Sequence, residues 1–129
     1  MEGKQNMKTE DILNLDCTKQ ENIRMINKLM WKIKPVEREL EREGIEKNQK
    51  APLEILEKCL HGICIHYHYK AQYINPYYEA DKFVFYSCSM LNTEDDKTPK
   101  WIGNIYAKTY WELVAKQLIK LYGDIRKGK

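Results

Sequence analysis

The residues with the clearest chemical potential lie close together near the middle of the chain. Two cysteines and three histidines stand within one short stretch, at Cys59, His61, Cys64, His66 and His68. On a strand, positions 64, 66 and 68 would share a face, and thiolates and imidazoles on one face are ligands that zinc accepts. A closed zinc site needs a fourth ligand, and downstream the chain offers only the lone Cys88. We therefore expect a helix–strand junction without metal or other cofactor, with Cys64, His66 and His68 as the candidate ligands if a metal binds.

The other reactive groups predict no catalytic site. Cys88 stands in a run of strand-forming residues, where a packed core thiol is expected instead of an activated nucleophile. The acidic run Glu94, Asp95 and Asp96 belongs to a polar loop and lacks the glycine and terminal glutamate of a calcium-binding EF-hand. The chain also has no GxGxxG, P-loop or GxSxG motif. We therefore predict a protein that is not an enzyme.

Aromatic residues are concentrated in the second half of the chain. All of them except Trp31 lie between Tyr67 and Tyr122, and tyrosine is the most frequent. So many tyrosines exceed what one small core can hold, so some of them must reach the surface. Tyrosine joins a large apolar ring to a polar tip and is enriched at protein interfaces. We expect Tyr77 and Tyr78 to contact a partner protein.

A second candidate surface lies along the last predicted helix. Lys108 precedes this helix, and Lys116, Lys120 and Lys127 follow one another as a basic stripe. Such a stripe is usually a solvated face, but it can also contact phosphates, and lysines between aromatic rings can form a stacking platform for bases. Nucleic acid is therefore the alternative partner, with Lys108, Trp111, Lys116 and Lys120 as candidate binding residues.

The composition suits one cytoplasmic domain. The chain has 129 residues, of which 22 are basic and 19 acidic, and this mixed charge is weaker than that of a dedicated nucleic-acid binder. No apolar run approaches the roughly 20 residues of a membrane helix. The segment Met1–Glu10 lacks the apolar core of a secretion signal. Because four cysteines without CxxC spacing then indicate reduced thiols, we predict a cytoplasmic protein with no membrane contact.

The N-terminal part is predicted to be helical. Residues 1–8 are polar and expected to be disordered, and a short helix follows from Thr9. A Thr18–Glu21 capping box predicts the start of a second helix, which should end by Lys34 because a proline follows it. A third helix is expected to stop at Gly44. This region, residues 9–50, either packs on the apolar surface of the remaining chain or contacts a partner or a second copy.

Residues 51–129 predict an α-β-β-β-α domain. A helix should run from Pro52 to about His66, and a T-x-x-E box, Thr109–Glu112, should open the last helix. Three strands are expected between them, at residues 68–74, 82–91 and 101–106, with a turn at Asn75–Pro76. Short connections imply an antiparallel meander. The predicted fold class is therefore α+β, a three-stranded antiparallel sheet packed on two helices and preceded by short N-terminal helices.

This order of elements resembles that of the double-stranded-RNA-binding domain. In that family the first helix, the loop between the first two strands and a lysine cluster at the start of the last helix contact RNA. The corresponding positions here are Asn75-Pro76-Tyr77-Tyr78-Glu79 and Lys108-Thr109-Tyr110-Trp111-Glu112, with one lysine in place of the cluster. The resemblance implies the shape of the domain and, as the alternative function, nucleic-acid binding.

A second resemblance concerns the segments Lys8–Asp16 and Trp101–Tyr122, which look like parts of small bacterial proteins found on mobile elements. That likeness implies an accessory role. The leading expectation is therefore a small non-catalytic protein that binds another protein through a Tyr/Trp-rich surface.

Overall fold

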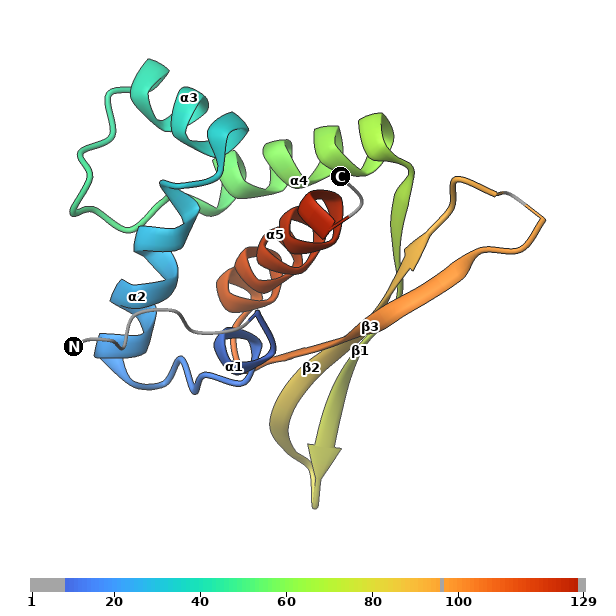
Figure 1. Ribbon diagram of the computed structural model, residues 1–129. Helices are drawn as coiled ribbons and strands as arrows, with labels where there is room; N and C mark the ends of the chain where they lie inside the picture. Colours follow the sequence, from blue (N-terminus) through green and yellow to red (C-terminus); the bar gives the residue numbers. More distant parts are fainter. Residues whose placement is uncertain (1–8, 96, 128–129) are drawn as a thin grey trace.

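The computed structural model describes residues 9–95 and 97–127, with one long helix, α5, at the centre (Figure 1). The helices are α1 (Thr9–Leu13), α2 (Gln20–Met30), α3 (Lys34–Arg42), α4 (Leu53–Tyr67) and α5 (Tyr110–Lys127). The strands are β1 (Tyr69–Glu79), β2 (Lys82–Asn92) and β3 (Lys100–Ala107). The predicted α+β class and the α-β-β-β-α order are confirmed. The disorder expected for residues 1–8 lies outside the described residues.

The three strands form one antiparallel sheet in the order β1-β2-β3. Helix α5 packs on β2 and β3, and α4 contacts both β1 and α5. Cys88, Met90 and Ile105 point to these helices and are buried, because alternate residues of a strand face opposite sides. We call this side the helix side of the sheet and the opposite side the outer face.

Helix α5 is covered on nearly every side. Each residue from Trp111 to Ile119 is buried, because α1 and α2 pack on the side that α4 and the sheet leave free. The expectation that the N-terminal helices pack on the rest of the chain is confirmed. The basic stripe predicted on this helix is wrong at Lys116, because only 2% of the surface of this residue is exposed to solvent.

Local signals placed some helix ends correctly. Thr109 Oγ1 accepts a hydrogen bond from the Glu112 N–H at 3.1 Å, and the Glu112 carboxylate accepts one from the Lys108 N–H at 3.0 Å. Gly44 ends α3 with a φ of 74°, a left-handed conformation that favours glycine. These contacts confirm the second T-x-x-E box and the glycine stop.

The first T-x-x-E box does not form. Helix α2 begins at Gln20, and its N-cap residue Lys19 makes no side-chain cap. The hydroxyl of Thr18 donates to Asp16 Oδ1 at 2.7 Å instead, and the Thr18 N–H donates to the same oxygen at 3.0 Å. Asp16 therefore takes the hydroxyl that the box would have used.

The hairpin between β1 and β2 differs from the prediction. The strand continues through Asn75 and Pro76, and the chain reverses at Ala80 and Asp81, which have φ values of 48° and 67°. Pro76 is tolerated because β1 is an edge strand, so one side of its backbone needs no ladder partner. A register shift between Gln72 and Asn75 marks the irregular part of the strand.

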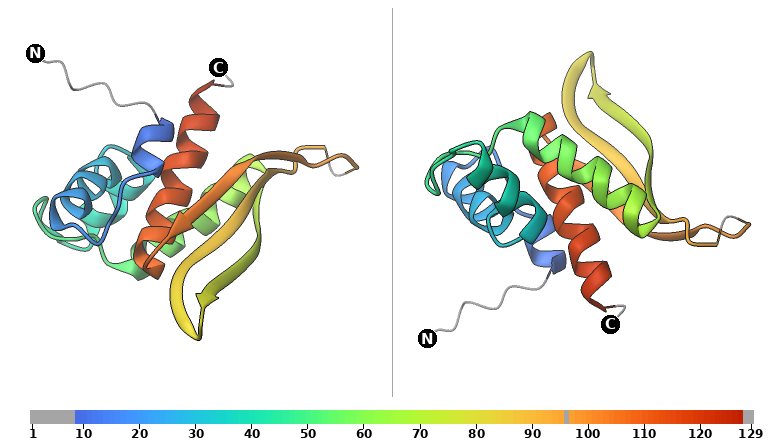
Figure 2. Two further views of the ribbon diagram at one scale, coloured as in Figure 1. Left: turned by 90° about the horizontal axis from the view of Figure 1, so that it is seen from below. Right: turned by 90° about the horizontal axis from the view of Figure 1, so that it is seen from above.

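The hairpin projects away from the helices in both views of Figure 2. None of the helices among the described residues has the length and apolar character that a membrane crossing requires.

Candidate functional site

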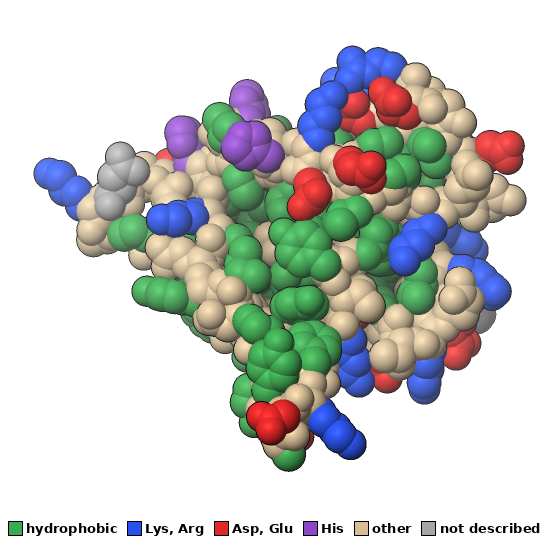
Figure 3. Space-filling view, turned by 180° about the vertical axis from the view of Figure 1, so that it is seen from behind, with side chains coloured by type: hydrophobic (Ala, Val, Ile, Leu, Met, Phe, Trp, Pro, Cys, Tyr) green, Lys and Arg blue, Asp and Glu red, His purple; other side chains and the backbone are tan. Residues whose placement is uncertain are grey.

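Four aromatic rings form a row on the helix side of the sheet, three from the β1–β2 hairpin and one from the start of α5. We call Tyr78, Phe83, Tyr86 and Tyr110 the helix-side cluster. Ring centroids are 6.0 Å apart for Tyr78 and Phe83, 4.8 Å for Phe83 and Tyr86, and 6.3 Å for Tyr86 and Tyr110. Tyr78 remains 56% exposed, and Phe83 and Tyr110 each 41%. From behind, apolar side chains form a band that runs from the hairpin tip into the body of the protein (Figure 3).

The outer face carries a second group of rings, the outer cluster of Tyr77, Phe85, Tyr106 and Trp101. Tyr77 stacks on Phe85 with centroids 4.9 Å apart, and Phe85 meets Tyr106 edge to face at 5.6 Å. The Trp101 Nε1–H donates to Asn104 Oδ1 at 3.1 Å. Trp101 and Tyr106 are 59% and 52% exposed, so the structure describes no element that covers them.

The structure thus separates Tyr77 and Tyr78, which were expected to form one surface. Both side chains are exposed, but they are neighbours on a strand and point to opposite faces. A register shift pairs Tyr77 with Phe85 and Tyr78 with Phe83, so Val84 is an extra residue on β2. This bulge brings Phe83 to the side of Tyr78.

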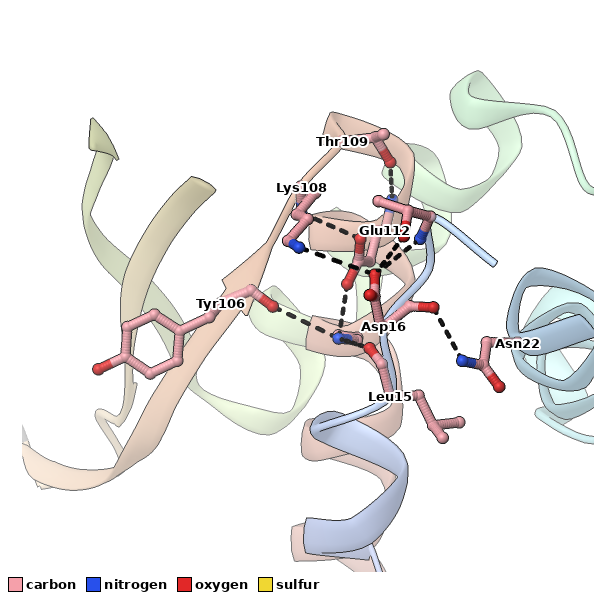
Figure 4. A network of polar contacts seen from close by, with 9 residues as sticks. Leu15, Asp16, Asn22, Tyr106, Lys108, Thr109 and Glu112 are labelled. Carbon is pink, nitrogen blue, oxygen red and sulfur yellow. Dashed lines mark hydrogen bonds and ion pairs between the residues drawn. The ribbon is translucent and has the colours of Figure 1, made fainter. Parts of the chain in front are cut away.

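Lys116 belongs to a buried polar network, which Figure 4 shows from close by. Its Nζ lies 2.6 Å from Glu112 Oε2 and donates to the Leu15 carbonyl at 2.8 Å and, more weakly, to the Tyr106 carbonyl at 3.5 Å. Only 3% of either side chain of the ion pair is exposed. The prediction that Lys116 contacts phosphate is wrong, because its donors already join three segments of the fold.

Trp111 is also unavailable to a partner. It is buried, and its Nε1–H donates to the Ala51 carbonyl at 2.7 Å. The expectation that Trp111 binds a partner is therefore wrong, because the ring fixes the start of α5 to the segment before α4.

The two remaining lysines of the predicted stripe lie apart. Lys108 is exposed, with Nζ 3.9 Å from Asp16 Oδ1. Lys120 is half-buried, and its Cε is 3.1 Å from the place that a Cβ at Gly103 would occupy. Lys120 therefore lies against the helix side of β3, and the side chain of Lys127 lies outside what the structure describes.

The cysteine and histidine stretch lies at the end of α4, and not on a strand. Cys64 and His66 lie on α4, where residues two apart point to different sides, and His68 caps the helix with a φ of 63°. Within residues 9–95 and 97–127, no three His, Cys, Asp or Glu side chains come together to hold a metal ion. The three candidate ligands are therefore not brought to one face.

The buried thiols are in a protonated state at neutral pH. Burial raises the pKa of Cys88 to about 11, and burial with the nearby Glu112 carboxylate raises that of Cys17 to about 11. A nucleophilic cysteine needs the opposite shift, which basic neighbours or a helix N-terminus supply. The environment of Cys88 accordingly agrees with its expected role as a packed core residue.

A small cavity adjoins the outer cluster. It measures about 280 Å³ and lies between the α1–α2 connection and the end of the sheet. Its walls include Asn14, Phe85, Tyr106 and Lys108.

Sequence reasoning did not single out Phe83, Tyr110 and Trp101 as surface residues. The alternation of aromatic residues along β2 was a visible signal, but the bulges that divide the rings between two faces had none.

A comparison with known protein families, curated proteins and solved structures found no match to this chain.

Proposed function

We propose that this protein is a small, non-catalytic binding protein that docks on another protein through its helix-side cluster. The observation that carries the proposal is a row of four neighbouring aromatic rings, three of them more than 40% exposed, that runs from a projecting hairpin to the start of α5. Aromatic rings that are held in place and then desolvated at the centre of an interface are the usual source of binding energy between proteins.

The surroundings of the cluster support the same reading. The hairpin tip carries Glu79, Asp81 and Lys82, all exposed, so charges of both signs border the rings. An apolar centre with a polar rim is the common organisation of a protein interface. Because neighbouring rings already restrict one another, little side-chain entropy remains to be lost on binding.

The test begins with a photo-crosslinking residue at position 78, which would be used in cells to identify the partner by mass spectrometry. Affinity is then measured with purified partner and the variants Tyr78→Ala and Phe83→Ala. We expect each variant to weaken binding at least tenfold, the effect of losing an interface residue worth about 1.4 kcal/mol or more.

The matched control is Trp101→Ala, which removes an equally exposed ring from the outer face. Circular dichroism and thermal unfolding should show that all three variants remain folded. Binding of the partner at wild-type affinity by both Tyr78→Ala and Phe83→Ala would exclude the helix-side cluster as the interface.

The double-stranded-RNA-binding mode is a weaker candidate. Of its four expected contact residues, Trp111 and Lys116 are buried and Lys120 is half-buried against β3. Among these four residues, only Lys108, just before the last helix, is exposed enough to contact a phosphate.

A further inference from the structure

The outer face of the sheet has a different composition from the helix side. Strand register arranges it in rows across the sheet, and alternate residues of each strand contribute to them. The rows are Lys70, Leu91 and Trp101; then Gln72, Ser89 and Asn104; then Asn75, Ser87 and Tyr106; and finally Tyr77 and Phe85. Amides and hydroxyls thus fill the middle of the face, and aromatic rings stand at both ends.

Contacts within the face hold these rings in place. Ser89 Oγ donates to Asn104 Oδ1 at 3.0 Å, and Asn104 Nδ2 donates to the Tyr106 hydroxyl at 3.4 Å. The same Asn104 oxygen accepts the Trp101 Nε1–H. Asn104 therefore orients two rings that are each more than half exposed.

The charge of this face is one-sided. Lys70 lies in the row of Leu91 and Trp101, and Lys108 follows the end of β3. All residues of the rows defined above are described by the structure, and none of them is Asp or Glu. Lys108 has Asp16 within 3.9 Å, but both groups of that pair are about half exposed. The face is therefore complementary to a polyanion.

We propose that the outer face binds single-stranded nucleic acid, with bases stacked on Trp101 and Tyr106 and phosphates near Lys70 and Lys108. Bases must be unpaired to stack on side chains, so a duplex should not occupy this face. The amides and hydroxyls of the middle rows can bond to base edges, whereas the centre of a protein interface is usually apolar. The cavity beside Phe85 and Tyr106 has room for one further base at the end of the strand. This inference is independent of the protein partner on the helix side.

The binding test uses the full chain and fluorescein-labelled single strands of about 12 nucleotides, oligo-U and oligo-dT, with a duplex of equal length. We expect both single strands to raise the anisotropy and the duplex to be bound more weakly. With two phosphate contacts, log K should fall against log salt with a slope of about −1.4, and Lys70→Gln should flatten this slope by about 0.7.

The variants locate the bound strand. Trp101→Ala and Tyr106→Ala should each weaken binding about tenfold, a typical loss for one stacked base. Tyr78→Ala, a similarly exposed ring on the helix side, should bind as the wild type does. Stacking should also quench tryptophan fluorescence in the wild type but not in Trp101→Phe, because Trp31 and Trp111 are buried.

Three outcomes would overturn the proposal. The first is no binding at about 100 μM protein and about 50 mM salt. Even non-specific binding of nucleic acid should be detectable under these conditions. The second is binding that Trp101→Ala and Tyr106→Ala leave unchanged. The third is loss of the protein partner in Trp101→Ala, which would assign the outer face to that partner. The first two results can be measured and interpreted even if the helix-side cluster binds no protein.

Discussion

The side chain of Lys116 shows how a single residue ties distant parts of the chain together. Its ammonium group contacts a carboxylate on the same helix, the carbonyl of Leu15 after α1 and the carbonyl of Tyr106 in β3. Removing one partner of a buried ion pair leaves an uncompensated charge away from water, which costs about 3 kcal/mol or more. Lys116→Met should therefore lower the free energy of unfolding, measured with urea, by about that amount.

Two controls distinguish burial of charge from the loss of a lysine in general. The exposed pair of Lys58 and Glu39 is open to water, so Lys58→Met should change the free energy of unfolding by less than about 1 kcal/mol. The double variant Lys116→Met with Glu112→Gln should recover much of the loss, because no buried charge remains. Equal effects of Lys116→Met and Lys58→Met would contradict the role assigned to Lys116.

The sequence predicted the exposure of some residues of the candidate site but not of others. The difference lies in how far apart in the sequence the contacting residues are. Exposure of Tyr77 and Tyr78 followed from the excess of tyrosines, since a small core cannot hold them all. Burial of Lys116 and Trp111 did not follow, because it depends on α1, α2 and the segment before α4, which are distant in the sequence. A helical spacing of lysines indicates a shared face but not what covers that face.

At the scale of an element, the β1–β2 hairpin stores backbone strain at its turn. Ala80 and Asp81 both have positive φ, the pattern of a two-residue turn that glycine and asparagine normally occupy. The cost of a left-handed conformation at a residue with a Cβ is about 1–2 kcal/mol. Ala80→Gly should therefore raise the free energy of unfolding by about 0.5–1 kcal/mol, since added freedom in the unfolded chain offsets part of the gain.

The matched control lies in the same hairpin. Ala71 is a half-buried strand residue paired with Met90, where glycine has no conformational advantage. Ala71→Gly should lower the free energy of unfolding by about 0.5–1 kcal/mol. Both variants are measured by thermal or urea unfolding. A loss of stability in both variants would show that the turn is not strained at Ala80.

The same hairpin marks the limit of prediction for the elements. Gly44 and the Thr109–Glu112 pair end or begin helices through contacts with their own neighbours, so their sequence signals sufficed. The Asn75–Pro76 pair is typical of a turn, but an edge strand accepts it. The true turn has neither glycine nor asparagine, so no local signal marked it. The bulge at Val84, which decides the face of each ring, depends on pairing between strands.

For the whole molecule, the compositional boundary near residue 50 does not coincide with a boundary of packing. One hydrophobic core includes Ile12 of α1, Ile26 and Met30 of α2, and Leu118 of α5. Helix α5 serves as the common axis, and the sheet with its two aromatic faces is held on one side of it. The position of both candidate surfaces therefore depends in part on α1 and α2, which contribute no residue to either aromatic cluster.

A fragment of residues 51–129 should accordingly fail to fold by itself. It would expose the side of α5 that α1 and α2 cover and would leave Lys116 without the Leu15 carbonyl. We expect broad, non-cooperative thermal unfolding by circular dichroism, with binding of a hydrophobic dye, as for a chain that has lost fixed packing. Addition of a peptide of residues 9–50 should restore a cooperative transition, since it supplies the missing apolar surface. A fragment that unfolds cooperatively without this peptide would instead be an independent α-β-β-β-α domain, and the N-terminal helices would then be an attachment to it.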